Sequence, residues 1–451
     1  MPRLTADRDA RALAHEVLVR VETTDAFADV LLGERLARAE LGGPDAALAT
    51  RLVYGTLAWQ GRLDHHLRAL VHTSLDRLDP PVRAALRLGL YQLLFLDRIP
   101  DYAAVDASVR LARDAGRGAT GLVNAVLRRA AARAPDLSLP DPAGDPLERL
   151  AVEWSHPRWL VERWASAFGM AELSRLLAAN NVPGPTAVRA NRLRTTREAL
   201  LAELGAAGVH AAAGRWAEDA IVVDGAAAQL RALPAWRAGR LAFQGEGSQL
   251  ITTLLGLRPG TRLLDACAAP GGKACHATAI LERRGRVAAL DRRSTGARRI
   301  RAEAGRLGAA VEIAVGDARR PPFAGAFDAV LVDAPCSGLG TLRRHPELRW
   351  RRRPEDIARL ATLQRDILSG VAPLVRPGGL LVYAVCTLTR QENEEVVASF
   401  CGAHRGFAVE HAAHAAGVPA ELVTPEGFLR TLPHRDGLDG FFAARMRLAQ
   451  P

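Results

Sequence analysis

The chain has 451 residues, of which 49% are hydrophobic and 24% are charged, and at about 150 residues per domain this length predicts about three globular domains. No apolar run approaches the ~20 residues that span a bilayer, and the N-terminus leads into an amphipathic stretch rather than a signal-peptide core, so we expect a cytoplasmic protein without a membrane partner. The formal net charge of +11 favours a polyanionic partner, most simply nucleic acid.

The first 134 residues predict a helical domain. Apolar side chains recur there at helical spacing, and no strand-like alternation is found. Pro80 and Pro81 suit the first turn of a helix, where a missing N–H costs no hydrogen bond. The best-defined helices are predicted over 12–21, 82–96 and 121–129.

A proline-rich, polar stretch at 135–146 is predicted to be a linker. The residues that follow, 147–240, predict a small α+β segment. Within this segment a helix opens in 154–164, a strand covers 186–191 and a further helix covers 196–204.

From residue 241 to 451 the pattern changes to short apolar strands alternating with helices of about ten to twenty residues, which predicts βαβ units and a mostly parallel sheet. In such sheets, ligands bind beyond the carboxyl ends of the strands. The strands are predicted over 262–266, 286–291, 311–315, 328–333 and 379–384.

A glycine loop, AspAlaCysAlaAlaProGlyGlyLys (265–273), joins the first of these strands to a helix. Its glycines allow close backbone approach, and the helix N-terminus favours a carboxylate such as that of a methionine moiety. The loop is neither GxGxxG nor a Walker motif, which disfavours a dinucleotide or phosphate cradle. Of the 60 basic residues, Lys273 is the one lysine; the rest are arginine, so we expect Lys273 to be functional.

Carboxylates follow successive strands of this region. Asp291 ends the second strand, where a carboxylate can accept hydrogen bonds from both ribose hydroxyls. Asp317 follows the third strand and could accept one from an adenine amino group. Each aspartate alone is more often a cap or turn residue, but their recurrence at strand ends favours a cofactor site.

Two cysteines also stand at strand ends. Cys336 lies in AspAlaProCysSerGly after the fourth strand, and Cys386 lies in TyrAlaValCysThrLeu after the fifth. Asp333, three residues before Cys336, could contact a cytosine edge. Each thiol is either a nucleophile or a small core residue, and sequence physics leaves both roles open. Thr389 with Glu392 predicts a capping box for the next helix.

The cysteine count argues against disulfide bonds and metal binding. The number is odd and no CxxC pair occurs, so neither a disulfide framework nor a metal site is expected. The five residues are Cys267, Cys275, Cys336, Cys386 and Cys401.

The stretch 341–354 carries six arginines together with His345 and Trp350. A basic run with an interleaved aromatic suits phosphate contact and base stacking, whereas the alternative is a solvated surface loop. Its position directly after Cys336 favours contact with RNA or DNA.

These motifs together resemble those of the bacterial Sun/RsmB (Fmu) and eukaryotic Nop2 RNA cytosine-5 methyltransferases. The helical N-terminus, with ValTyrGlyThrLeu (53–57) and GlyLeuTyrGlnLeu (89–93), resembles the NusB-like RNA-binding domain of the RsmB branch. Gly245 stands where that family usually has aspartate, and AlaValCysThrLeu replaces the commoner AlaThrCysSer.

The resemblance implies an all-α NusB-like domain (1–134), a linker (135–146), a small α+β segment (147–240) and an α/β Rossmann-like methyltransferase domain (241–451). It also implies C5 methylation of cytosine in RNA, at cytosine 967 of 16S ribosomal RNA for the RsmB branch, by a chain that we expect to act as a monomer. Cys386 matches the family's nucleophile, and Cys336 matches the cysteine that assists release. S-adenosylmethionine would be held by Cys267, Ala268, Ala269, Pro270, Gly271, Gly272, Lys273, Asp291, Asp317 and Asp333.

Two rival functions lead to different expectations. A DNA cytosine methyltransferase would use the ProCys thiol, Cys336, as its nucleophile. A non-catalytic RNA-binding assembly or antitermination factor would bind RNA regardless of Lys273 or either thiol. An amino-methylating enzyme is disfavoured because AspAlaProCys replaces an AsnProProTyr-type loop.

Overall fold

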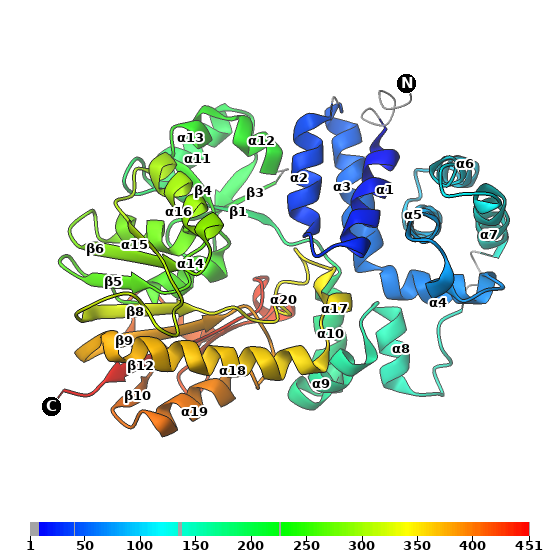
Figure 1. Ribbon diagram of the computed structural model, residues 1–451. Helices are drawn as coiled ribbons and strands as arrows, with labels where there is room; N and C mark the ends of the chain where they lie inside the picture. The colour runs from blue at the N-terminus through cyan, green and yellow to red at the C-terminus, as the bar shows by residue number, and fades with distance from the viewer. Residues whose placement is uncertain (1–8, 40, 134–137, 225–226, 451) are drawn as a thin grey trace. The chain divides into compact units, whose positions relative to one another are not determined.

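The computed structural model describes residues 9–39, 41–133, 138–224 and 227–450 (Figure 1). The chain forms two compact units, which we call the helical unit (1–183 and 342–351) and the sheet unit (184–341 and 352–451). The unit boundary at residue 183 falls within the predicted 147–240 segment, and the predicted domain limits stay a prediction. The predicted 135–146 linker lies partly outside the described residues.

The helical unit contains no strand within its described residues, as predicted. Pro80 and Pro81 begin α5, and its apolar face packs in one core with α1, α3 and α7. Tyr91 lies so close to Gly55 that a Cβ there would be 2.0 Å from the ring. The helices are α1 Ala10–Thr23, α2 Ala28–Arg38, α3 Gly43–Ala58, α4 Gln60–Leu70, α5 Pro80–Phe95, α6 Asp101–Leu111, α7 Ala119–Arg133, α8 Pro146–Glu153, α9 Arg158–Phe168, α10 Met170–Asn180 and α17 Leu348–Arg351.

The basic stretch after Cys336 packs within the helical unit, which makes the prediction of a nucleic-acid contact wrong for its central residues. Arg349 is fully buried and donates to the carbonyls of Ala58 and Ser155 at 3.1 and 3.0 Å. Arg351 donates to four backbone carbonyls between residues 21 and 26. Trp350 packs on Gly61, where a Cβ would lie 2.4 Å from the indole. Arg349 and Trp350 are held in internal packing and Arg351 by internal carbonyls, so these side chains are not available to phosphates or bases.

The sheet unit is built on an eight-stranded sheet in the order β10-β12-β9-β8-β5-β6-β7, with β11 paired to β12. The pairs among β5 to β9 are parallel, and those involving β12 are antiparallel. The strands are β5 Arg262–Asp265, β6 Arg286–Asp291, β7 Glu312–Val315, β8 Phe327–Asp333, β9 Val375–Val385, β10 Phe407–Glu410, β11 Leu429–Thr431 and β12 Phe441–Leu448.

Helices cover both faces of this sheet (Figure 1). Alternate strand residues point to opposite layers: Leu263 packs in the core with α14 and α15, and Leu264 packs in the core with α18 and α19. The helices are α14 Glu246–Thr253, α15 Gly272–Ile280, α16 Ser294–Leu307, α18 Pro354–Val371, α19 Glu394–Ala403 and α20 Pro433–Asp436.

All five predicted strands are confirmed, but the helix expected between the third and fourth is wrong. Residues 316–326 form a loop instead. Pro321 and Pro322 lack the N–H donors of a helix, and Gly325 adopts a φ of +92°.

A second, four-stranded antiparallel sheet in the order β2-β3-β1-β4 belongs to the same unit. The predicted strand at 186–191 and helix at 196–204 are confirmed as β1 and α11. Asn191, which follows β1, donates to the carbonyls of Gly239 and of Leu307, the last residue of α16, each at 2.8 Å, and so ties the small sheet to a helix beside the large one. The elements are β1 Thr186–Ala190, α11 Arg197–Ala206, β2 Ala211–Ala213, β3 Ala220–Val223, α12 Ala227–Ala232, α13 Pro234–Arg237 and β4 Leu241–Phe243.

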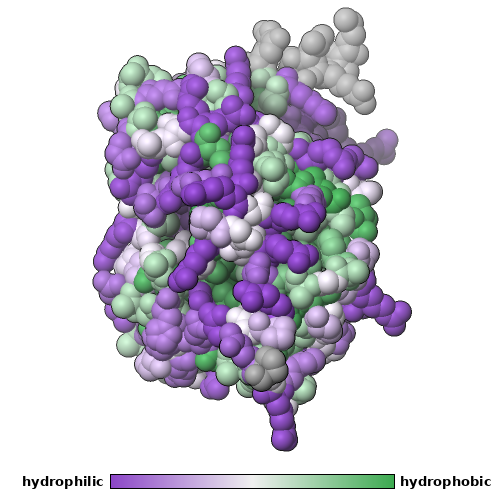
Figure 2. All heavy atoms as spheres, turned by 90° about the vertical axis from the view of Figure 1, so that its left-hand side faces the viewer, coloured by the Kyte–Doolittle hydropathy of each residue, from purple (hydrophilic) through white to green (hydrophobic). Residues whose placement is uncertain are grey.

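Hydrophilic side chains cover much of one face of the molecule. On the face shown in Figure 2, hydrophilic side chains predominate and hydrophobic ones form smaller patches between them. Among the described residues, none of the helices combines the length and apolarity required to cross a bilayer.

We predict that Arg349→Ala destabilises the helical unit by about 2–4 kcal/mol, because several buried carbonyls lose a charged donor. Urea denaturation followed by circular dichroism measures the loss. Arg20→Ala, which removes an exposed arginine of α1, should change the free energy of unfolding by less than about 0.5 kcal/mol. Equal effects of the two substitutions would contradict a structural role for Arg349.

Candidate active site

The glycine loop lies between β5 and α15 at the carboxyl edge of the parallel strands. Gly271, the N-cap of α15, adopts a φ of +110°, in the left-handed region that favours glycine. A Cβ at this position would also lie 3.1 Å from the Cα of Ile300. The backbone can therefore turn tightly into the helix, and the first N–H groups of α15 remain directed at the loop.

Asp265 begins the loop as an almost completely buried carboxyl group, 1% exposed. Neither oxygen accepts a hydrogen bond of normal geometry from the described residues, although the N–H of Cys267 is near. Burial, and then repulsion from Asp333, raise the pKa of Asp265 to about 7 against the opposing effect of Lys273. A buried acceptor without a full partner set is suited to a ligand that brings a donor.

Lys273 extends from the first turn of α15 and pairs with Asp333 at the end of β8, with 2.5 Å between Nζ and Oδ2. Burial lowers the pKa of Lys273, but the ion pair outweighs burial and raises it above its ordinary value. The side chain is therefore an ammonium ion paired with the carboxylate of Asp333, and Asp265 adds a smaller electrostatic attraction. The single lysine of the chain thus connects the glycine loop to the strand that leads to Cys336.

Asp291 ends β6, and Asp317 follows the neighbouring parallel strand β7 by two residues, as predicted. The amide of Gly316 donates to the carbonyl of Asp291 at 3.0 Å. The carboxylate of Asp291 accepts from the amide of Arg293 at 2.8 Å and packs against Gly296, where a Cβ would lie 2.2 Å from it.

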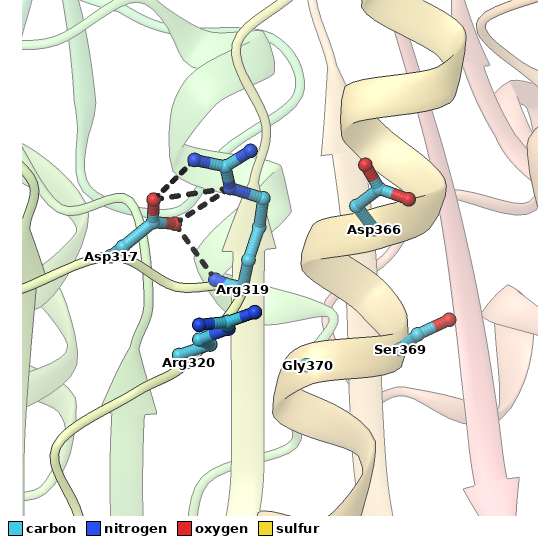
Figure 3. A pocket seen from close by; sticks show the side chains of 6 residues that line it. All are labelled: Asp317, Arg319, Arg320, Asp366, Ser369 and Gly370. Atoms are coloured by element: carbon cyan, nitrogen blue, oxygen red, sulfur yellow. Dashed lines mark hydrogen bonds and ion pairs between the residues drawn. The ribbon is translucent and has the colours of Figure 1, made fainter.

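Asp317 differs from Asp291 because its carboxylate is already paired. Arg319 donates to it from the backbone N–H and from the guanidinium, the closest contact being 2.6 Å (Figure 3). The hydrogen bonds from Arg319 lower the pKa of Asp317 to about 2. An adenine amino group would have to share this carboxylate with Arg319.

A cavity of about 600 Å³ lies beside this pair, between the loop after β7 and helix α18 (Figure 3). It is lined by Asp317, Arg319, Arg320, Asp366, Ser369 and Gly370. Neither thiol lines it, so this cavity is separate from the sulfur chemistry described next.

Cys336 and Cys386 lie with their Sγ atoms 3.3 Å apart. The reason is the parallel pairing of β8 with β9, which places Asp333 opposite Ala384. Both thiols follow this pair within three residues, so both loops leave the sheet at the same edge. The amide of Gly340 also donates to the carbonyl of Cys386 at 3.0 Å, and a Cβ at Gly340 would lie 2.0 Å from the carbonyl oxygen of Gly440.

The two thiols are not equivalent in their surroundings. The hydrogen bond to Cys386 and burial raise the pKa of Cys336 well above its ordinary value. Cys336 therefore keeps its proton and can donate it toward Cys386. Cys386 also lies close enough to Lys273 to contribute to the raised pKa of that lysine.

Glu392 is the residue whose place in the site the sequence did not reveal. The predicted capping box with Thr389 is wrong, because α19 begins at Glu394 with Asn393 as its N-cap. Thr389 does donate to Glu392, at 2.9 Å, but within a buried network that also includes the residues following both thiols. The spacing Thr-x-x-Glu is the same in both arrangements, so local sequence could not distinguish them.

The remaining three cysteines are not part of the thiol pair. All five cysteines are free, and burial raises the pKa values of Cys267, Cys275 and Cys401. Among the described residues, no group of three or more His, Cys, Asp or Glu side chains could hold a metal ion.

A doubly wound sheet with a glycine loop, strand-end carboxylates and a thiol pair defines an α/β enzyme of the cofactor-dependent transferase class. The model of the 16S rRNA methyltransferase RsmB/F family matches residues 252–447, the NusB family model matches 8–132, and the ferredoxin-like domain model of the RsmF/B-like methyltransferases matches 156–229. The chain belongs to the RsmB/F family of S-adenosylmethionine-dependent rRNA methyltransferases.

Individual relatives are similar to the chain in sequence over nearly its whole length. The chain is 37% identical to a probable ribosomal RNA small subunit methyltransferase B of Bacillus subtilis, covering 97% of this chain and 98% of the relative. It is 36% identical to ribosomal RNA small subunit methyltransferase B of Pseudomonas syringae pv. tomato, covering 97% and 96%. Among solved structures, that of PH0851 superposes with a TM-score of 0.84 at 26% identity, covering 97% of this chain and 98% of the other.

Because the pKa of Asp265 is raised in the folded protein, Asp265 stabilises the sheet unit most at low pH. This contribution should be lost as the pH rises from about 4 to about 7, by at most about 1.4 kcal/mol per pH unit. The measurement is the difference in free energy of unfolding between wild type and Asp265→Asn across that range. A difference that stays constant, or that grows in favour of wild type as the pH rises, would contradict the burial of a protonated Asp265.

Proposed function

We propose that this enzyme methylates C5 of a cytosine in ribosomal RNA, with cytosine 967 of 16S rRNA as its target. The observation that carries the proposal is the pair of thiols 3.3 Å apart at the ends of adjacent strands. Cytosine C5 is a poor nucleophile until a thiolate adds to C6 and makes the ring enamine-like. The relatives named as small-subunit rRNA methyltransferases support the class of RNA.

Cys386 is assigned as the nucleophile. Its sulfur lies 3.3 Å from the thiol of Cys336 and near the cation of Lys273, and a hydrogen-bond donor and a nearby cation are what a nucleophilic thiolate requires. The sulfur forms a bond to C6 of the cytosine, which must be flipped out or single-stranded because C6 cannot be reached within a stacked duplex. Asp333, paired with Lys273, would meet the Watson–Crick edge of the same base.

The residues of the glycine loop fit S-adenosylmethionine as the cofactor. The N-terminus of α15 suits its carboxylate, and the buried oxygens of Asp265 retain acceptor capacity at the loop. Cys267 to Lys273 would surround the methionine moiety, Asp291 the ribose and Asp317 the adenine, with Asp333 beside the methyl donor. When bound, the cofactor supplies an electrophilic methyl group to C5. NSun6 from Pyrococcus horikoshii, which shares this fold at 22% identity and a TM-score of 0.59, was solved with SFG, an analogue of S-adenosylmethionine.

Cys336 is assigned to release. After methylation, the C5 proton must leave and the bond between Cys386 and C6 must break. Once the sulfur of Cys386 is bonded to carbon, it no longer holds the charge and hydrogen bond that raise the pKa of Cys336. Cys336 can then give up its proton more readily, which suits a base at this last stage.

We predict that Cys336→Ala accumulates a covalent protein–RNA adduct, and that Cys386→Ala forms none and loses methyl transfer by roughly 10³-fold or more. Denaturing gels, after incubation with unmodified small-subunit rRNA and labelled S-adenosylmethionine, measure both. An active Cys386→Ala together with an inactive Cys336→Ala would favour the DNA-type assignment of the thiols. Failure of wild type to label this rRNA would favour another RNA as substrate.

Lys273→Met should reduce methyl transfer by about 10²-fold or more, because Asp333 and Asp265 lose their shared cation. Methyl transfer and RNA affinity are measured in parallel, and RNA affinity should change little. The exposed Arg405→Met serves as a control for loss of one positive charge. If wild type binds the RNA but transfers no methyl group, the result would favour the alternative function, a non-catalytic RNA-binding factor.

A further inference from the structure

Glu392 is a fully buried carboxylate in the loop that follows Cys386. Its Oε1 accepts hydrogen bonds from the backbone N–H of Ser337 at 2.8 Å and from Nε2 of Gln364 at 3.1 Å. Its Oε2 accepts from the hydroxyls of Ser337, Thr387 and Thr389 at 2.6, 3.2 and 2.9 Å. Each oxygen thus has at least two donors.

The donors come from both thiol loops. Ser337 directly follows Cys336, and Thr387 directly follows Cys386, so the carboxylate accepts hydrogen bonds from the residue next to each thiol. The two hydroxyls also contact each other at 2.7 Å. Helix α18 closes the network, since Gln364 donates both to Glu392 and to the carbonyl of Pro335.

Burying this charge is expensive for the fold. A buried carboxylate is normally paired with a cation, yet the hydrogen-bond donors that surround Glu392 are neutral. A neutral side chain could fill the same space at a lower desolvation cost. A carboxylate, however, accepts at both of its oxygens, and hydrogen bonds to an ionised acceptor are shorter and stronger than neutral ones.

We propose that Glu392 is a positioning residue, whose carboxylate holds the Cys336 and Cys386 loops in the arrangement that keeps the two sulfur atoms within 3.3 Å of each other. It acts through Ser337 and Thr387 and touches neither sulfur. Its charge also contributes, after Cys386 and burial, to the raised pKa of Cys336. The effect on catalysis rests on the proposed function, whereas the effect on the distance between the sulfurs does not.

Glu392→Gln keeps the shape and removes the charge. The amide can accept at one end only, so one set of donors loses the ionised acceptor and the hydroxyls must turn to accept instead. Glu395→Gln is the matched control, because Glu395 lies three residues further along the chain and is exposed.

The distance between the sulfurs can be read by disulfide formation, which needs close approach and a defined dihedral angle. Diamide takes two electrons and two protons from the two thiols and is reduced to its hydrazine as the Cys336–Cys386 bond forms. Peptide mass mapping at timed intervals gives the rate for this pair separately from the other cysteines. We expect a rate at least about tenfold lower in Glu392→Gln than in wild type, and an unchanged rate in Glu395→Gln.

Catalysis should respond at the chemical step. We expect kcat on rRNA to fall about 10–10²-fold in Glu392→Gln with KM nearly unchanged, because a misplacement of about 1 Å costs up to ~10²-fold in rate while RNA binding is left intact. If Glu392→Gln only destabilised the fold, the fraction of active enzyme would fall instead. That fraction is measured by titrating the amount of covalent protein–RNA adduct that can be trapped.

Ser337→Ala provides a second test if Glu392→Gln fails to fold, since it removes one hydroxyl donor and keeps the backbone bond to Glu392. Disulfide formation and kcat should both fall by a smaller factor, about threefold. Wild-type rates of disulfide formation in folded Glu392→Gln, or in Ser337→Ala where Glu392→Gln does not fold, would overturn the proposal. If wild type transfers no methyl group, the proposed function fails, while the disulfide rates still decide the role of Glu392.

Discussion

The pairing of β8 with β9 is the constraint on which the site depends. Because the two strands run parallel and hydrogen-bond to each other, their carboxyl ends meet at one edge, with Asp333 opposite Ala384. Fifty residues separate Cys336 from Cys386 along the chain, yet this register leaves their sulfurs 3.3 Å apart. A shift of the register by one residue would turn the following loops to opposite faces of the sheet.

Buried charge is concentrated at this edge. Asp265 and Glu392 are almost fully buried, Lys273 and Asp333 form a partly exposed ion pair, and all four residues lie at or just beyond the carboxyl ends of the parallel strands. Such an arrangement costs folding free energy compared with an apolar core, and proteins retain it mainly where chemistry requires it. The hydrogen bond to Cys386, burial and the charge of Glu392 raise the pKa of Cys336, so the protonation of this thiol depends on its partner.

Much of the architecture could be predicted from the sequence. The five parallel strands are continuous apolar runs, because both of their faces are covered, and Pro80 and Pro81 mark a helix start by their own geometry. The candidate cofactor residues could be placed at strand ends for the same reason. The antiparallel strands β10 to β12 were missed, because β10 and β11 span only four and three residues and β12 is followed by no glycine loop or acidic end.

Two of the errors share a cause, which is that side-chain partners distant in sequence decided the outcome; the missing helix at 316–326 instead has the local cause given above. Arg349 and Trp350 have the composition of a nucleic-acid contact, but the carbonyls and the glycine that bury them lie about 170 to 290 residues earlier. Glu392 has the spacing of a helix cap, but its donors follow thiols on two strands. Neither arrangement can be read from local spacing, because it depends on the register of strands and on the packing of helices.

The most direct test of the central claim is to identify the sulfur that bonds to RNA in the unmodified enzyme. An RNA substrate with 5-fluorocytosine at the target position traps the adduct, because the fluorine cannot leave as a proton does. Digestion and tandem mass spectrometry then locate the nucleotide on a peptide. The account predicts the modification on Cys386; modification of Cys336, or of neither thiol while methylation of normal RNA proceeds, would contradict it.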